Sequence, residues 1–113
     1  AVEAHKQEQA LADPMKIRAK MIDGAAHVTV LMIHPMETGQ RKDARGQVLP
    51  AHFIQHVTAT VNDRPVLNMQ CGPAISRNPM FAFRVKDARP GDRVVITWQD
   101  NKGDKARGET MVA

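Results

Sequence analysis

The feature that most constrains the fold of this chain is an alternation of apolar and polar residues with a period of two. Residues 15–22, MKIRAKMI, begin it, with an apolar side chain at each odd position and Lys or Arg at three of the even positions. Successive side chains of a β-strand point to opposite faces, whereas a helix repeats every ~3.6 residues. The segment is therefore predicted to be a half-buried strand, and Asp23-Gly24 after it to be a turn.

Six further segments carry the same alternation or a short run of β-branched apolar residues, with turn residues between them. They are residues 27–33, 52–61, 65–71, 80–86, 93–99 and 104–113. Seven short strands without an amphipathic helix predict an all-β chain folded as an immunoglobulin-like β-sandwich. The alternation also predicts side chains that face the core: Leu67, Met69, Cys71, Phe81, Phe83, Val85, Val94, Ile96 and Trp98. The disulfide of antibody domains is excluded, because the chain has a single cysteine.

The length of 113 residues favours one domain, which we place at residues 14–113. Residues 1–13 contain good helix formers but lack the apolar run of a signal peptide, and Asp13-Pro14 stops any helix there. We expect them to form a flexible extension that is partly foreign to the native protein. No stretch approaches the ~18 consecutive apolar residues of a membrane span, so membrane insertion is not expected.

The net charge of +4 raises the prospect of an acidic partner such as a nucleic acid. Acidic residues are interleaved with basic ones in most charged stretches, which favours an ordinary solvated surface. The chain has one Trp and no Tyr, so aromatic platforms for stacking bases are scarce. A nucleic-acid partner is therefore not expected.

Residues 34–54, HPMETGQRKDARGQVLPAHFI, interrupt the strand pattern with a long polar loop at residues 35–51. Loops of this length are usually functional or disordered. His52 and His56 lie four residues apart, a spacing that separates them by about 13 Å along a strand. They cannot then share one zinc ion, whose nitrogen ligands lie about 2 Å from it. We predict two histidines on a polar face.

A copper or redox site is the alternative that the side chains leave open. His34, Met36, Met32 and Cys71 include the soft ligands that copper prefers. They do not form the closely spaced set of a blue-copper sandwich, since no histidine follows Cys71. Cys71 is a small buried hydrophobe or a reactive thiol, depending on its exposure. The alternative function is a small periplasmic metal- or redox-binding sandwich protein that uses Cys71, His34 and methionines.

No motif for nucleophilic catalysis, phosphate binding or zinc-dependent hydrolysis occurs in the sequence, and its carboxylates are scattered over turns. We therefore predict no enzyme activity and no cofactor. A binding module remains, in which the charged side chains of the 35–51 loop orient a partner and speed its encounter.

Four stretches resemble the SoxZ family of sulfur-oxidation proteins: ADPMKIRAK, LMIHPMETGQRKDARGQVLPAHFI, NMQCGPAISRNPMFAFRVK and GDRVVITWQDNKG. The resemblance runs from Ala12 to the end of the chain, and its most specific part is HPMETGxRKDxxGxxxPAHFI. It implies an immunoglobulin-like fold and a non-catalytic subunit that forms a heterodimer with SoxY. In that complex, the cysteine of SoxY's C-terminal Gly-Gly-Cys-Gly-Gly arm holds the sulfur intermediate of thiosulfate oxidation.

The resemblance also implies transient partners and a location. SoxAX, SoxB and, where present, SoxCD visit the carrier in the periplasm, and the subunit is exported together with SoxY because it lacks its own signal. This chain has no Gly-Gly-Cys-Gly-Gly, so Cys71 is not expected to inherit the carrier role. We expect the isolated chain to be capable of forming a homo-oligomer through the surface that SoxY would cover.

The residues that we predict to contact a partner lie in and around the 35–51 loop. They are His34, Met36, Glu37, Arg41, Lys42, Asp43, Arg45, His52 and Phe53. Cys71 is added as a candidate reactive thiol. No catalytic, cofactor-binding or metal-binding residue is predicted.

Overall fold

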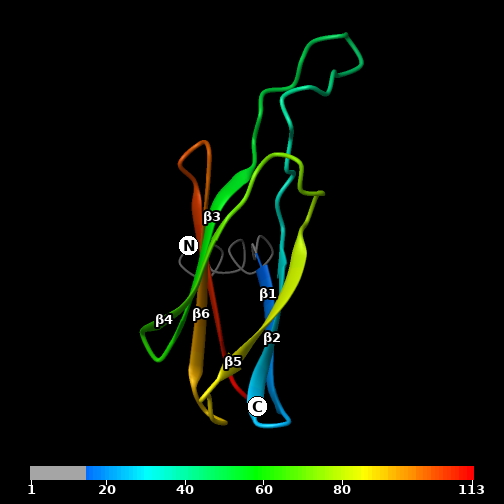
Figure 1. Cartoon of the computed structure of the whole chain (residues 1–113). Helices are drawn as coiled ribbons and strands as arrows, with labels where there is room; N and C mark the ends of the chain where they lie inside the picture. The colour runs from blue at the N-terminus through cyan, green and yellow to red at the C-terminus, as the bar shows by residue number, and fades with distance from the viewer. Residues whose placement is uncertain (1–14) are drawn as a thin grey trace, which may run out of the picture.

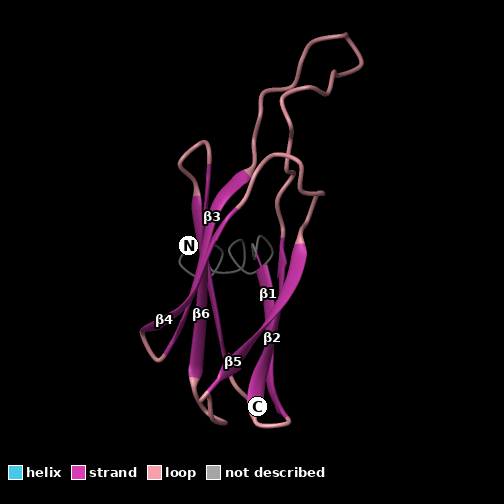
Figure 2. Cartoon of the chain, in the orientation of Figure 1, coloured by secondary structure: helices cyan, strands magenta, loops and turns pink. Residues whose placement is uncertain are grey.

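A computed structural model describes residues 15–113 of the chain (Figure 1). The expectation for residues 1–13 lies outside the described residues. Seven strands form the regular structure: β1 Met15–Ile22, β2 Ala25–Met32, β3 Ile54–Val61, β4 Arg64–Gln70, β5 Met80–Lys86, β6 Arg93–Asp100 and β7 Lys105–Met111. Each overlaps one predicted segment (Figure 2). None of the described residues belongs to a helix of the length and hydrophobicity that crossing a membrane requires.

The strands form two antiparallel sheets that face each other. One sheet has three strands in the order β1-β2-β5, and the other has four in the order β4-β3-β6-β7. The chain changes sheet between β2 and β3, between β4 and β5, and between β5 and β6, so each sheet mixes early and late segments (Figure 1). This arrangement is an immunoglobulin-like β-sandwich, and it confirms the predicted fold.

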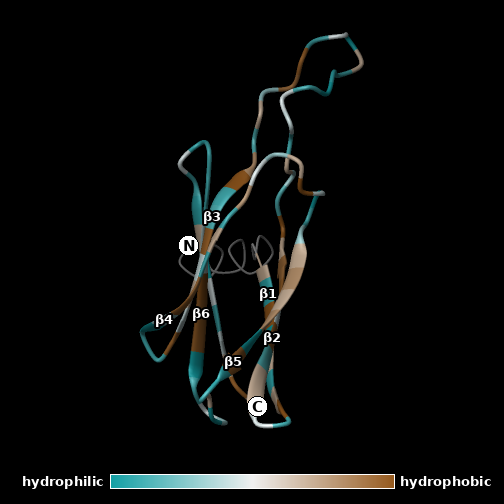
Figure 3. Ribbon diagram, in the orientation of Figure 1, coloured by the Kyte–Doolittle hydropathy of each residue, from teal (hydrophilic) through white to brown (hydrophobic). Residues whose placement is uncertain are grey.

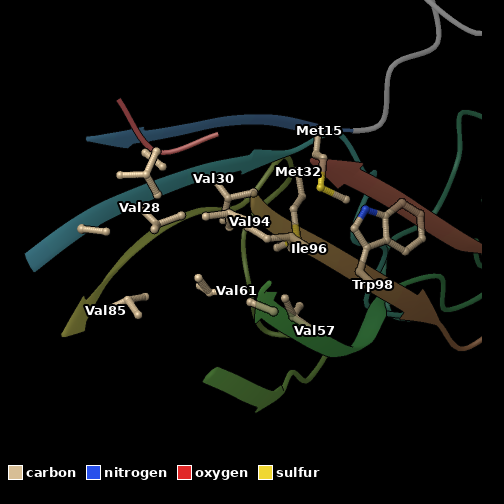
Figure 4. Packing of buried hydrophobic residues seen from close by; sticks show 14 of the residues in the cluster. Met15, Val28, Val30, Met32, Val57, Val61, Val85, Val94, Ile96 and Trp98 are labelled. Carbon is tan, nitrogen blue, oxygen red and sulfur yellow. The ribbon is translucent and has the colours of Figure 1, made fainter. Parts of the chain in front are cut away.

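The core lies between the inward faces of the two sheets, as the period-two pattern predicted. The central strands β2, β3 and β6 supply its fully buried side chains, among them Val28, Met32, Val57 and Ile96 (Figure 4). Hydrophobic residues concentrate in the strands, while the turns are mostly hydrophilic (Figure 3). The predicted inward side chains all belong to this core or pack against it: Leu67, Met69, Cys71, Phe81, Phe83, Val85, Val94, Ile96 and Trp98.

One side of the sandwich is closed. β1 and β7 approach each other there, and a Cβ atom added to Gly108 would lie 2.7 Å from Cγ of Met15. The C-terminal residue continues the closure, because the N–H of Met21 donates to the carbonyl of Ala113 at 3.0 Å and the N–H of Ala113 donates to Ala19 at 2.9 Å. The opposite side, between β4 and β5, has no comparable seam.

The predicted 35–51 loop is a paired hairpin that stands out beyond the end of the sandwich (Figure 1). Backbone bridges join Glu37 to His52 at its base and Lys42 to Val48 near its tip. We refer to residues 35–52 as the 35–52 hairpin. The prediction that His52 lies on the polar face of a strand is wrong, because β3 begins only at Ile54 and His52 belongs to the hairpin.

Candidate functional site

Two histidines and one aspartate from separate segments meet at the base of the 35–52 hairpin, and we call them the His34–Asp100–His52 cluster. Nε2 of His34 lies 3.1 Å from Oδ2 of Asp100, and Nε2 of His52 lies 2.7 Å from the same oxygen. The two imidazole rings meet edge to face, with centroids 4.5 Å apart. His34 and Asp100 are buried, while the His52 side chain is 23% exposed. Only the outer histidine is therefore open to solvent.

The carboxylate of Asp100 is held by four hydrogen bonds. Oδ1 accepts the backbone N–H groups of Lys102 at 3.0 Å and Asp104 at 2.9 Å, and Oδ2 accepts the two histidines. Burial by itself would raise the pKa of Asp100, but the hydrogen bonds from His34, His52 and the two amides outweigh it and lower the pKa below its ordinary value. Asp100 is therefore ionised at neutral pH.

The hydrogen bonds also fix the tautomer of His34. Its Nδ1 atom accepts the backbone N–H of Met36 at 3.1 Å, so this nitrogen carries no proton. The proton of the ring must then lie on Nε2, where His34 donates it to Asp100. The ring thus links the first residues of the hairpin to the end of β6.

The cluster has the composition of a metal site, since its candidate ligand atoms all lie within 4.8 Å of one another. A metal ion on Nε2 of His34 would require the ring proton on Nδ1, where ligating histidines normally donate to an acceptor. Nδ1 faces the N–H donor of Met36 instead. The residues therefore do not fit a metal ion, and we interpret the cluster as a hydrogen-bonded latch between the hairpin and β6.

Two asparagines complete the anchorage of the hairpin. Asn78 accepts the N–H of His34 through Oδ1 at 3.0 Å, and its own N–H donates to the carbonyl of His34. Asn101 accepts the N–H of Phe53 through Oδ1 at 2.8 Å and donates from Nδ2 to the carbonyl of Ala51 at 2.9 Å. Both ends of the hairpin are therefore tied to neighbouring loops, which holds it in a defined direction.

The outer part of the hairpin is organised by its own charges. Arg41 forms a two-pronged ion pair with Glu37, and this hydrogen bonding lowers the pKa of Glu37 and raises the pKa of Arg41. Oδ1 of Asp43 accepts the N–H groups of Arg45 and Gln47, which shapes the tip. An open depression of about 300 Å³ lies between the hairpin and the segment 73–77. The hairpin is thus a structured projection with solvent-exposed charges.

The predicted contact residues fall into two groups. Arg41, Lys42, Asp43 and Arg45 are exposed on the projecting part of the hairpin, and the half-buried Glu37 at its base joins them through its ion pair with Arg41. His34 and Met36 are buried at its base, and His52 and Phe53 are half-buried there. The second group lies where the hairpin joins the sandwich, and its hydrogen bonds tie the hairpin to β6 and the turn after it.

Sequence reasoning missed Asp100, which is the centre of the cluster. Its local sequence, Asp100-Asn101-Lys102-Gly103, indicated only a tight hairpin turn, and that turn is present with Gly103 at a φ of +87°. No spacing in the chain connects Asp100 to His34, 66 residues away, or to His52, 48 residues away. The contact depends on the crossing of the chain between sheets.

Cys71 lies just after β4, half-buried and packed against the core. Its N–H donates to the carbonyl of Gln55 at 2.8 Å. Burial raises the pKa of its thiol, so the fraction of nucleophilic thiolate at neutral pH is smaller than for an exposed cysteine. This environment favours the small-hydrophobe interpretation over the reactive-thiol one.

The charged side chains of the three-stranded sheet are all basic. Strands β1, β2 and β5 contain no Asp or Glu, and their outward faces carry five exposed cations: Lys16, Arg18, Lys20, Arg84 and Lys86. Within residues 15–113 none of the five forms an ion pair. Opposite Arg84 in the register is His27, whose buried Nε2 has no hydrogen-bond partner in this range. The outward face of this sheet is therefore a basic surface, separate from the charged 35–52 hairpin.

A two-sheet sandwich with a projecting charged hairpin and a basic sheet face places the chain in the class of immunoglobulin-like β-sandwich domains. The chain belongs to the SoxZ family, sulphur oxidation protein SoxZ, whose sequence pattern it matches over residues 15–111. Proteins of this family take part in sulfur oxidation, are known as non-catalytic carrier subunits and are periplasmic. A search of curated proteins finds no match to the chain.

Proposed function

We propose that this chain is the SoxY-binding subunit of the sulfur-carrier complex of thiosulfate oxidation. It forms a heterodimer with SoxY and helps present the sulfur intermediate on SoxY's cysteine to the periplasmic Sox enzymes. The observation that carries the proposal is the family match over residues 15–111. The fold supports it, because a mobile arm that bears reactive sulfur requires a stable body beside it.

The two kinds of partner require two kinds of surface. A permanent heterodimer buries a large apolar interface, and the open side of the sandwich offers partly buried apolar side chains from β4 and β5. Transient partners are selected more by charge, which steers encounter. The exposed charges of the 35–52 hairpin suit that second role, toward SoxAX, SoxB and, where present, SoxCD.

The proposal includes the route to the periplasm. The chain crosses the membrane as a passenger of SoxY, so the heterodimer forms before export. This order favours an interface that is stable in the absence of the sulfur intermediate and of the enzymes that process it.

Light scattering after size-exclusion chromatography tests the proposal. The chain alone, SoxY alone and their mixture at micromolar concentration are compared, and a one-to-one complex is expected in the mixture. A chain that stays monomeric alone and forms no complex with SoxY would overturn the proposal. The test does not depend on any residue assignment within the interface.

A further inference from the structure

We propose that SoxY adds a β-strand to the free edge of β5. This inference rests on the function proposed above, and it assigns both the surface and the chemistry of the partner segment. The sandwich has four edge strands, β1 and β5 in one sheet and β4 and β7 in the other. Unpaired edges bind other strands through their backbone groups, so the state of each edge decides where a partner can add.

The edges of β1 and β7 are closed against each other. Ala113 pairs with the outer edge of β1 through Met21 and Ala19, and Gly108 of β7 lies against the side chains of Met15 and Ile17. An incoming strand would have to displace these contacts. The β1 edge is therefore occupied at Ala19 and Met21, and the β7 strand is flanked by side chains of β1.

Two features of the β4 sequence disfavour pairing of another strand at its free edge. Pro65 removes one backbone donor, and the register against β3 shifts so that Val66 is a bulged residue between Pro65 and Leu67. Prolines and bulges are the devices that protect natural edges from pairing. β4 is thus a poor acceptor for a partner strand.

The edge of β5 has no such protection. Its seven residues pair with β2 in an unbroken antiparallel register and include no proline. The N–H of Met32 donates to the carbonyl of Pro79, so by alternation the backbone groups of Met80, Ala82 and Arg84 point away from β2. Within residues 15–113 these outward groups have no hydrogen-bond partner, so they can pair with the backbone of an added strand.

Apolar side chains on both faces of β5 would add contacts to the backbone pairing with a partner strand. On the inner face, Phe81 and Phe83 stack with centroids 6.0 Å apart and remain only partly buried, although both pack against the core. On the outer face, Met80 is 69% exposed. A strand beside β5 that carries apolar residues at alternate positions would complete the burial of the two phenylalanines.

Charge identifies the occupant as a partner strand with carboxylates rather than a second copy of this chain. Arg84 and Lys86 are exposed on the outer face, in line with the cations of β1. Two copies of β5 side by side would join two outward faces that carry cations and no carboxylate, and like charges in neighbouring strands are destabilising. We therefore assign Asp or Glu to the outer face of the SoxY strand, opposite Arg84 and Lys86.

Hydrogen exchange measured by NMR tests the inference on the unaltered chain. The amides of Met80, Ala82 and Arg84 are expected to exchange at least about tenfold more slowly in the SoxY complex. The matched controls are Asn68 and Gln70, whose amides point outward from the β4 edge and should be unaffected. If a complex forms but the β5 amides are not protected, this inference is wrong and the proposed function still stands.

If no complex forms, both are wrong. If the β5 amides are protected in the concentrated chain without SoxY, the β5 edge binds a second copy of this chain, and the inference is wrong.

A pair of proline variants gives an independent test. Ala82→Pro removes one outward donor from β5, and Asn68→Pro removes the equivalent donor from β4. We expect Ala82→Pro to weaken SoxY binding at least about tenfold and Asn68→Pro to leave it within about twofold. Equal effects of the two variants would contradict the inference. If Ala82→Pro does not fold, Arg84→Glu replaces it, with Lys105→Glu on β7 as its control and the same expected contrast.

Discussion

His34 and Asp100, 66 residues apart in the chain, are joined by a buried hydrogen bond of 3.1 Å between Nε2 and Oδ2. Because Nδ1 of the same ring accepts the N–H of Met36, the histidine bridges the hairpin and β6 with a fixed proton position. The most distinctive stretch of the sequence is therefore held by the core of the sandwich, and its exposed charges project from a rigid base.

The first prediction concerns the latch itself. Asp100→Asn keeps the shape of the side chain but replaces one acceptor oxygen by a donor and removes the charge. We expect the free energy of unfolding at pH 7 to fall by about 3 kcal/mol, because buried donors lose a charged acceptor. Urea denaturation of both proteins measures this difference in the free energy of unfolding. Asp104→Asn, at an exposed position of the same turn, is the control and should change stability by less than about 0.5 kcal/mol.

The second prediction concerns pH. The pKa of Asp100 is lower in the folded chain than its ordinary value of 3.8, so the folded state releases this proton more readily than the unfolded state. Its stabilising contribution is complete above about pH 5, where the carboxyl is ionised in the unfolded chain as well, and is lost as the pH falls through the folded pKa. The difference in unfolding free energy between the wild-type chain and Asp100→Asn should shrink over that range. A difference that stays constant down to pH 2 or so would contradict the assignment.

The third prediction concerns metals. Because Nδ1 of His34 faces a backbone donor, we expect no stoichiometric zinc or copper in the purified chain and no rise in melting temperature on adding either ion. Elemental analysis and thermal melts check this. One bound equivalent that disappears in His52→Ala would restore the metal-binding alternative.

The fourth prediction concerns the projecting charges. Lys42 and Arg45 are exposed and form no ion pair within the described range, so their reversal should spare the fold. We expect Lys42→Glu to lower the association rate of the SoxY complex with SoxB by roughly 3- to 10-fold at low salt. Stopped-flow measurements at several salt concentrations give the rate. Lys105→Glu makes the same change in net charge on β7, and an equal effect from it would argue against a local docking surface.

The fifth prediction concerns the closed side of the sandwich. A Cβ atom at position 108 would lie 2.7 Å from Cγ and 2.8 Å from Sδ of Met15, so Gly108→Ala requires the buried Met15 side chain to shift within the β1–β7 seam. We expect a loss of about 1–3 kcal/mol in unfolding free energy. Gly72→Ala is the control, because nothing lies within 4 Å of its added Cβ atom. Similar losses in the two variants would indicate a backbone effect rather than a steric one.

The strands were predictable because each is a local pattern. Alternation in segments such as 15–22 and 80–86 specifies which side chains face inward, and the core contains them as expected. The position of His52 was not predictable in this way. Its neighbours alternate as a strand would, but the backbone bridge to Glu37 draws the residue into the hairpin before β3 begins.

The candidate site was predictable only in its exposed half. The charged residues from Glu37 to Arg45 stand out in the sequence because a polar run between apolar strands must lie at the surface. The buried half depends on Asp100, whose hydrogen bonds to His34 and His52 cross between distant segments. Hydrogen bonds between residues so far apart in the sequence produce no regular spacing from which they could be predicted.

The sequence by itself determined the class of fold, the approximate strand segments and the family resemblance, because alternation and turn residues act over a few neighbouring positions. The tertiary structure alone decided which histidines meet, that the cations of β1 and β5 share one face, and that β5 keeps a free edge. These features arise from strand order and register, which place distant residues side by side through contacts that no local pattern encodes.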